Sequence, residues 1–312
     1  MDPLINVVFP VFAIVAAGYL AGRYKVLAAE SANALNRFVY FFALPAVLFI
    51  FPARQPIADV LNWPFIAAFL AGAAVTFALA FAANRLWFRH DAATFAVHSL
   101  NAIFPNTSYM GVPLFLTAFG PEGAMPAIVA TLVGISLMVG GTIATLEATR
   151  AKGPSVGKIV REVARVLCRN PLLIATVLGI MVSFLAVPIP VPIGNFLDLM
   201  ASAAGPAALF ALGLSLVGRS LLNGLGEVSW IALLKLAFQP FATWVMVTYV
   251  LDVDPHWADG AVILAALPVG AVAFVVAQQY DCYTRRTSSA IVLTTLLSVL
   301  TISGLLVMLE IG

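Results

Sequence analysis

The sequence predicts an all-helical membrane protein with ten transmembrane helices, built from two five-helix repeats of opposite orientation. Composition is the first reason: of 312 residues, 62% are hydrophobic and only 10% are charged. A soluble domain could not cover that much apolar surface with so few polar side chains. The other two reasons are the one-sided placement of the basic residues and an echo between the two halves of the chain.

Apolar runs long enough to cross a bilayer follow one another along the whole chain. A spanning helix needs about 20 predominantly apolar residues. We expect the ten spans at Leu4–Gly22, Ala34–Phe51, Trp63–Trp87, Ala92–Phe119, Met125–Glu147, Pro171–Val187, Ile193–Val217, Ser229–Leu251, Trp257–Gln279 and Thr287–Leu309. The first run ends without an Ala-x-Ala cleavage pattern, so we expect it to be retained as a helix.

The Lys and Arg residues gather on one side of this arrangement. If the N-terminus is placed outside, 13 of the 16 basic residues lie in inside loops, namely Arg23, Lys25, Arg85, Arg89, Arg150, Lys152, Lys158, Arg161, Arg165, Arg169, Arg219, Arg285 and Arg286. Arg54 lies outside, and we assign Arg37 and Lys235 to the ends of spans. Because cytoplasmic loops carry the excess of Lys and Arg, both termini are predicted on the periplasmic side of a bacterial inner membrane.

The two halves of the chain echo each other at a nearly constant offset. The matches are Pro10 with Pro171, Gly18 with Gly179, Ala43–Phe49 with Ala204–Phe210 and, two residues out of step, Phe104-Pro105 with Leu267-Pro268. Because each half has five spans, an odd number, the second half must be inverted relative to the first. Inverted repeats are typical of secondary transporters. The alternative is a membrane protein without a repeat, whose prolines match by accident.

A basic segment separates the halves. We divide the chain into a first repeat (1–147), a linker (148–170) and a second repeat (171–312). In Ser155–Arg169, valine and isoleucine side chains share one helical face, and four basic side chains share the other. This pattern predicts an amphipathic helix that lies on the anionic inner leaflet, in contact with membrane lipids.

The fourth predicted span contains two prolines and several polar residues. Pro105 and Pro113 flank the segment, with Gly111 between them. Pro105 removes a backbone amide hydrogen and clashes with the carbonyl one turn back. Freed backbone groups are costly in hydrocarbon unless they line a cavity or meet polar partners. We therefore expect a broken helix here.

The ninth predicted span repeats this design at Pro268 and Gly270, where glycine permits a sharp backbone and close approach by a ligand. Because the repeats are inverted, we expect the two interruptions to meet near the middle of the bilayer. The second half-helices should begin near Thr107 and Val269, and each should direct exposed amides and a positive dipole end toward that point.

Two half-helix N-termini aimed at one point predict an anion site without any buried Lys or Arg. The expected substrate-binding residues are Asn106, Thr107, Ser108, Tyr109, Val269 and Gly270, and the crossover is shaped by Pro105, Gly111, Pro113 and Pro268. The alternative is a pair of proline kinks that only shape packing.

Few titratable or metal-ligating residues lie within the spans. His98, Gln239 and Gln278 are candidates for a proton or polar relay, or for plain hydrogen bonds inside the protein. The three histidines are far apart in sequence, so we expect no metal site. We also expect no cofactor, no catalytic centre and no nucleic-acid partner, because no Ser-His, Asp-Asp or His-Glu-x-x-His constellation lies within the spans.

Two longer motifs surround the expected breaks. The first is Pro105-Asn106-Thr107, then Met110-Gly111-x-Pro113-Leu114, then Gly120; the second is Leu267-Pro268-x-Gly270-x-Val272-x-Phe274-Val275-x-Ala277, then Tyr280. Together with Ala43-Leu44-Pro45-Ala46 and Asn170-Pro171, they resemble the signatures of the auxin efflux carrier family. That family includes plant PIN carriers and bacterial permeases for malonate or malate, and the resemblance covers essentially the whole chain.

The resemblance implies a transporter for small organic anions, such as malonate, malate or an auxin-like carboxylate, with the carboxylate bound near Asn106. It also implies a homodimer with a scaffold of spans one, two, six and seven. Spans three to five and eight to ten would form a mobile transport unit that moves as an elevator. The chain departs from many plant carriers in its short linker, in the nonpolar Val269 and in the absence of a charge within the third span.

Two other functions stay open. A related sodium-coupled bile-acid-type symporter also has crossed broken helices, but its sodium sites need clusters of acidic and amide ligands, and few such groups lie near these breaks. A membrane sensor that does not transport would bind a ligand without flux.

Overall fold

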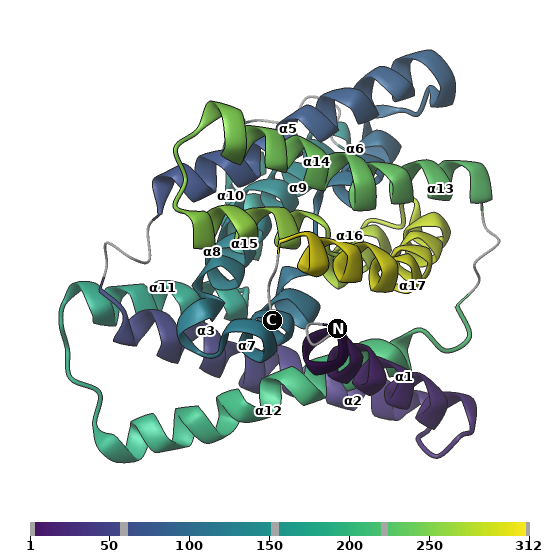
Figure 1. Cartoon of the computed structure of the whole chain (residues 1–312). Helices are drawn as coiled ribbons and strands as arrows, with labels where there is room; N and C mark the ends of the chain where they lie inside the picture. The colour runs from purple at the N-terminus through teal and green to yellow at the C-terminus, as the bar shows by residue number, and fades with distance from the viewer. Residues whose placement is uncertain (1–3, 57–61, 151–155, 220–223, 310–312) are drawn as a thin grey trace.

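The computed structural model describes residues 4–56, 62–150, 156–219 and 224–309. Every named element in these ranges is a helix, which confirms the all-helical prediction. Several long helices contain a π-helical turn, at Leu4–Val8, Val39–Ala43, Asn84–Phe88, Gly134–Val139, Leu234–Phe238 and Met246–Val250. The helices are arranged in two layers (Figure 1).

We call the lower layer of Figure 1 the scaffold layer. It consists of α1 (Phe9–Arg23), α2 (Ala29–Phe38), α3 (Leu44–Arg54), α11 (Pro171–Phe184) and α12 (Val191–Ser215). Helix α1 packs along α12, and α11 packs along α3. Each contact therefore joins one helix of the first half of the chain to one helix of the second half.

Glycines set the distance of closest approach in both of these contacts. A Cβ atom added at Gly18 would lie 2.1 Å from the carbonyl oxygen of Phe210, and one added at Gly179 would lie 2.4 Å from the carbonyl oxygen of Phe49. The two contacts are reciprocal, because Gly18 with Gly179 and Phe49 with Phe210 are matched pairs of the sequence echo. Small residues let membrane helices approach closely in this way.

We call the remaining helices outside the linker the crossover layer. It consists of α5 (Trp63–Ala83), α6 (Ala92–Ile103), α7 (Val112–Phe119), α8 (Met125–Val133), α9 (Gly140–Arg150), α13 (Leu225–Leu233), α14 (Gln239–Val245), α15 (Pro255–Ala265), α16 (Ala271–Gln279) and α17 (Thr284–Met308). Of these, α7 lies beside α12 in the lower part of Figure 1. The turn η4 (Thr107–Gly111) leads into α7, and the 3₁₀ turn η5 (Glu122–Ala124) leads into α8.

Asparagines and prolines start several of these helices. The side chain of Asn62 accepts a hydrogen bond from the Phe65 amide at 3.0 Å, and that of Asn170 accepts one from the Leu172 amide at 2.9 Å. A proline follows closely in both helices, Pro64 in α5 and Pro171 in α11. Capping side chains and first-turn prolines suit the N-terminus because its amides have no partner within the helix.

Seven helices of the described residues are long and apolar enough to cross a membrane. An eighth is formed if α10 (Val156–Leu167) and α11, which meet at an angle of 76°, count as one span. The predicted spans at Ala92–Phe119 and Trp257–Gln279 are each divided into shorter helices by a proline-containing break. The structure therefore supports a membrane protein with seven or eight candidate spans. The two breaks account for two of the ten expected spans, and the 14-residue length of α11 accounts for the third that is missing from the seven.

The linker contains the expected helix. Helix α10 has no buried residue, but its apolar face packs against α9. A Cβ atom added at Gly140 of α9 would lie 3.8 Å from the Val163 side chain and 3.7 Å from the Leu167 side chain. The first part of the linker, 151–155, lies outside the described residues. Helix α10 thus packs against α9 near its first residue, Gly140, and its basic face is exposed.

Segments assigned to the same side of the membrane meet in the structure. On the side predicted to be inside, Glu227 contacts His90 and forms an ion pair with Arg286 at 2.8 Å. On the opposite side, the rings of Phe119 and His256 have centroids 5.3 Å apart. In both contacts, the residues that meet come from segments predicted to lie on the same side of the membrane.

Candidate substrate site at two crossed helix breaks

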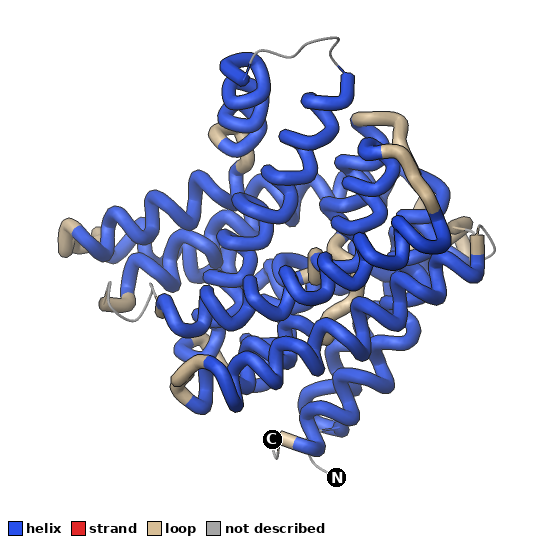
Figure 2. The backbone as a smooth tube through the Cα atoms, turned by 90° about the horizontal axis from the view of Figure 1, so that it is seen from above, coloured by secondary structure: helices blue, strands red, loops and turns tan. Residues whose placement is uncertain are grey.

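Two unwound segments cross in the interior of the crossover layer. One is Phe104–Asn106, between α6 and η4, and the other is 266–270, between α15 and α16. They run antiparallel: the Asn106 amide donates to the Pro268 carbonyl at 2.8 Å, and the Gly270 amide donates to the Phe104 carbonyl at 2.9 Å. Figure 2 shows short loop segments enclosed by helices near the centre of the molecule. The expected meeting of the two breaks is therefore present in the structure.

Proline explains why each helix stops where it does. Helix α6 ends at Ile103, two residues before Pro105, and α15 ends at Ala265, three residues before Pro268. The first break resumes at Thr107 as predicted, but in a π-helical turn. The second resumes at Ala271 rather than near Val269. Val269 stays extended because its amide donates to the Thr294 hydroxyl, at 3.1 Å, and to no carbonyl of its own helix.

The first break carries polar side chains with unused hydrogen-bonding capacity. Asn106 is 3% exposed, and its side-chain nitrogen Nδ2 has no hydrogen-bond partner among the described residues. The Thr107 hydroxyl lies 2.9 Å from that of Thr131. Ser108 and Tyr109 are also buried. The backbone amides of Asn106 and Thr107 are already bonded, to the Pro268 and Pro105 carbonyls, so the Asn106 side chain is the donor that this break leaves unpaired among the described residues.

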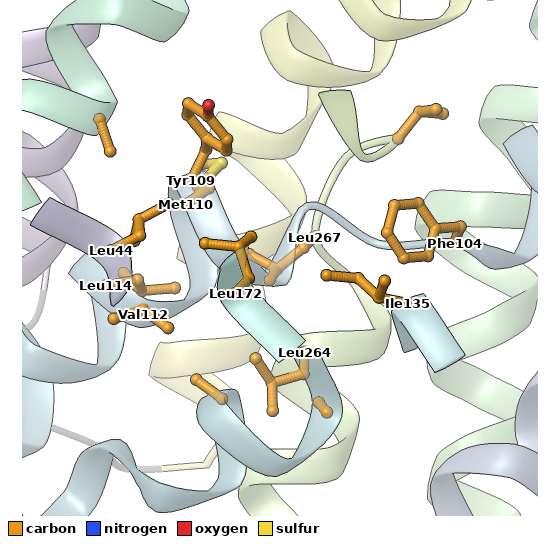
Figure 3. Packing of buried hydrophobic residues seen from close by; sticks show 14 of the residues in the cluster. Leu44, Phe104, Tyr109, Met110, Val112, Leu114, Ile135, Leu172, Leu264 and Leu267 are labelled. Atoms are coloured by element: carbon orange, nitrogen blue, oxygen red, sulfur yellow. The ribbon is translucent and has the colours of Figure 1, made fainter. Parts of the chain in front are cut away.

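The second break lacks polar side chains, and Gly270 is needed there for a different reason than expected. Its backbone angles, φ −68° and ψ 136°, are open to any residue, so the expected glycine-only backbone is wrong. A Cβ atom added at Gly270 would instead lie 2.4 Å from the Phe104 ring and 3.0 Å from the Pro105 carbonyl oxygen. Phe104 and Leu267 belong to the two unwound segments in Figure 3. The glycine therefore permits close approach of the other break.

The two breaks are supported by matched residues. Asp91 caps the N-terminus of α6, and Asp254 caps that of α15. Thr131 bonds to Thr107 at the first break, and Thr294 bonds to Val269 at the second. Each pair is separated by 163 positions (254−91 and 294−131), which is also the separation of Pro105 and Pro268. The same structural devices therefore occur once in each half of the chain.

The bent helix formed by α13, η7 and α14 supplies donors to both half-helices that end at the crossing. The Gln239 side chain donates to the Ile103 carbonyl at 2.9 Å, and the Lys235 ammonium donates to the Ala265 carbonyl. Both side chains are fully buried. Lys235 lies well inside the helical span Leu225–Val250. The assignment of Lys235 to the end of a span, and the expectation of no buried Lys or Arg, are therefore wrong.

Gly111 and Pro113 lie at and just beyond the crossing. A Cβ added at Gly111 would lie 2.9 Å from the Leu267 side chain, so this glycine also permits close packing of the breaks. Pro113 lines a cavity of about 400 Å³ between α7 and the scaffold helices α1 and α12. The lining of this cavity includes Thr117, Asp198 and Ser202 but not Asn106. The cavity marks where the two layers separate next to the crossing.

The relay candidates lie in different places. Gln278 is exposed near the end of α16, away from Gln239 at the crossing. His98 is fully buried, and its Nδ1 lies 3.1 Å from a Glu227 carboxylate oxygen and 3.2 Å from the Tyr283 hydroxyl. His98 is therefore hydrogen-bonded inside the protein, in contact with two titratable side chains.

A group with metal-ligating atoms forms at this end, which sequence spacing did not reveal. Ligand atoms of His90, His98 and Glu227 all lie within 4.8 Å of one another. Arg286 occupies the second carboxylate oxygen of Glu227, at 2.8 Å. That guanidinium pairs with the carboxylate, whereas the buried Nε2 atom of His98 has no hydrogen-bond partner among the described residues. Burial and the neighbouring Glu227 carboxylate raise the pKa of Tyr283, which keeps its hydroxyl protonated as a donor.

The crossing combines two half-helix N-termini, an unpaired amide donor and a buried ammonium in one apolar interior. Such a constellation favours a small anion, and crossed broken helices of this kind are typical of membrane transporters. A family model described as "Membrane transport protein" matches residues 3–306. The chain is a membrane transporter and belongs to this family, the auxin efflux carriers, as the sequence motifs predicted.

Three relatives illustrate the breadth of the family. The chain is 32% identical to a protein of Rhizobium meliloti (strain 1021) named "Putative malonate transporter", over 100% of this chain and 98% of that protein. It is 24% identical to "Uncharacterized transporter YfdV" of Escherichia coli (strain K12), over 92% and 91%. It is 25% identical to "Probable auxin efflux carrier component 5a" of Oryza sativa subsp. japonica, over 96% and 95%. These full-length matches indicate a transporter and not an enzyme.

Proposed function

We propose that the protein is a secondary transporter of small organic anions and that the substrate carboxylate binds at the crossing of the two breaks. The observation that carries the proposal is the buried Asn106 side-chain amide, which lacks a partner among the described residues beside the N-terminus of η4. An unsatisfied buried donor is costly. A bound carboxylate would supply the acceptor that the protein does not.

The proposed substrates are short dicarboxylates of the malonate type. The relative that carries the malonate name matches the chain over its full length. The crossing is closely packed by Phe104 and by the glycines at 111 and 270, which suits a short substrate better than a bulky aromatic one. Malate and auxin-like carboxylates are the competing substrates that a test must include.

The proposed mechanism is elevator-type alternating access in a protein with ten spans and two inverted repeats. The reciprocal contacts of Gly18 and Gly179 and the matched pairs Asp91/Asp254 and Thr131/Thr294 support the inverted repeat. The crossover layer would move against the scaffold layer, and the cavity beside Pro113 lies between the two. We further propose that two scaffold layers pair as a homodimer in the bacterial inner membrane.

Uptake by the purified protein in liposomes tests the function. We expect saturable uptake of labelled malonate. Unlabelled malonate should compete with this uptake strongly, and malate and indole-3-acetate should compete more weakly. Binding of malonate without uptake would favour a sensor. Strict dependence on Na⁺ would favour the sodium-coupled symporter.

The proposed orientation, with both termini outside, has a separate test. Cys168 is an exposed native thiol just after α10, on the side proposed to be cytoplasmic. In intact cells an impermeant maleimide should leave Cys168 unlabelled, and the same reagent should label it after permeabilisation. Labelling from outside would reverse the orientation.

A further inference from the structure

A lysine is buried next to the second break, and no acidic residue of the described ranges pairs with it. Lys235 is 0% exposed. The five ion pairs found among the described residues involve Asp198, Glu162 and Glu227 on the acidic side, and none of them includes Lys235. Its ammonium donates instead to the Ala265 carbonyl. A charged group inside a membrane span is costly, so such groups generally mark a function.

The position of the ammonium is informative. Ala265 is the last residue of α15, where the helix stops before Pro268 and its final carbonyls lose their partners. The C-terminus of a helix also carries the negative end of the helix dipole. In transporters with broken helices, the C-terminal ends of half-helices and the unwound carbonyls hold the coupling cation. Lys235 thus fills the kind of place that a bound cation fills elsewhere.

The other break shows that a hydrogen bond alone would not require a charge. One turn further along the same bent helix, Gln239 donates to the Ile103 carbonyl at the end of α6. That carbonyl is the equivalent end of the first half-helix, and a neutral amide satisfies it. Lysine at 235 therefore adds a positive charge beyond what capping a carbonyl needs.

We propose that Lys235 is a tethered cation of the transport site, which replaces a bound Na⁺ and attracts the anionic substrate at the crossing. This inference rests on the proposed function. It specifies the substrate class further: two negative charges at similar distances interact with a fixed positive charge about twice as strongly as one. Dianions should therefore depend on Lys235 more than monoanions do, and binding should not require Na⁺.

The test compares malonate with its monomethyl ester at about pH 8, where the first is a dianion and the second a monoanion. Affinities are measured by titration calorimetry for the wild type, for Lys235→Gln and for Lys25→Gln, which removes an exposed surface charge. We expect Lys235→Gln to weaken monoester binding about tenfold and malonate binding about 100-fold, because the logarithm of the loss scales with ligand charge. Lys25→Gln should change neither affinity.

The outcomes separate the two proposals. If the wild type binds neither ligand, the proposed function fails before Lys235 is tested. If the wild type binds both and Lys235→Gln weakens both by the same factor, the lysine has only a structural role and the inference is wrong. Should Lys235→Gln fail to fold, the wild type still decides: replacing Na⁺ by choline at constant ionic strength should leave malonate affinity unchanged, and a requirement for Na⁺ would overturn the proposal.

Discussion

The two helix breaks lie at matched prolines, Pro105 and Pro268, but differ in length and in side-chain chemistry. The first carries its own polar side chains, including an Asn106 amide without a partner among the described residues. The second, at Pro268, Val269 and Gly270, has none and takes its polar contacts from Thr294 and Lys235 on other helices. Both are held together by the same pair of antiparallel hydrogen bonds.

This difference indicates that the two related breaks have different roles. A duplicated backbone places two helix N-termini at one point, and that alone favours an anion. Under the proposed function, the first break contacts the substrate directly, and the second supplies charge and close packing. Substitutions at the two breaks should therefore fail in different ways.

The largest effect is expected from Gly270→Leu. The added side chain must displace the Phe104 ring and the Pro105 carbonyl, which lie 2.4 and 3.0 Å from the added Cβ. We expect malonate uptake to fall to background and the free energy of unfolding to fall by about 1–3 kcal/mol, as overpacking does. Uptake in liposomes and thermal unfolding in detergent measure the two effects.

Gly304→Leu is the matched control, because a Cβ added at Gly304 in α17 has nothing within 4 Å. Gly134 is unsuitable, since its added Cβ would lie 3.1 Å from the other side of the Phe104 ring. Wild-type uptake by Gly270→Leu would show that the second break need not pack closely against the first.

The second prediction concerns Asn106→Ala. Losing a hydrogen bond to a charged carboxylate costs about 1.5–3 kcal/mol, or about 10- to 150-fold in affinity. Since the Nδ2 atom has no partner to lose among the described residues, stability should change little. Calorimetry with malonate and thermal unfolding measure both quantities.

Asn101→Ala is the control in the same span. Asn101 donates to the Thr287 hydroxyl at 2.8 Å and to the Val97 carbonyl at 3.0 Å. It should lower stability without a comparable loss of affinity. The reverse pattern for the two variants would move the site away from the first break.

A pair of threonine substitutions sharpens the comparison of the two supports. Thr294→Val leaves the buried Val269 amide unpaired, so the free energy of unfolding should fall by about 1–3 kcal/mol. Thr131→Val removes a hydroxyl that bonds to the Thr107 hydroxyl at 2.9 Å and to the Ala127 carbonyl at 2.8 Å, but it leaves no backbone amide unpaired and should cost about 0.5–1.5 kcal/mol. Equal losses in thermal unfolding would mean that the two supports are equivalent.

The smallest effects are expected at the two capping aspartates. Asp91 accepts the Thr94 amide at 2.7 Å, and Asp254 accepts the His256 amide at 3.1 Å. Replacing either by alanine should cost about 0.5–1 kcal/mol, with the larger loss at Asp91. Thermal unfolding of both variants checks the order.

Asp91 also gives a pH dependence with a defined sign. The hydrogen bond from the Thr94 amide holds the pKa of Asp91 below its ordinary value. The stabilisation is therefore present above the unfolded pKa of about 3.9 and is lost as the pH falls through the lowered folded pKa. Asp91→Ala and the wild type should converge in stability at the acidic end, and a gap that widens there would contradict the role of the cap.

Much of the architecture could be predicted from local sequence. Hydropathy located the membrane segments, Pro105 and Pro268 located the breaks, and the motif around Asn106 indicated the family. These signals are local because apolar length and the missing proline amide act on the helix that contains them. They do not depend on how that helix is rotated.

Tertiary structure alone decided which side chains meet. Lys235 was assigned to a span end because the apolar run was expected to begin at Ser229, whereas the helix begins at Leu225 and places the lysine deep inside. His90 and His98 are more than 100 residues from Glu227 in the sequence, yet the packing of α6 against α13 brings the three side chains together. The crowding of Gly270 comes from Phe104 of the other half of the chain. Partners from remote helices depend on helix rotation and packing, which the order of residues along one helix does not encode.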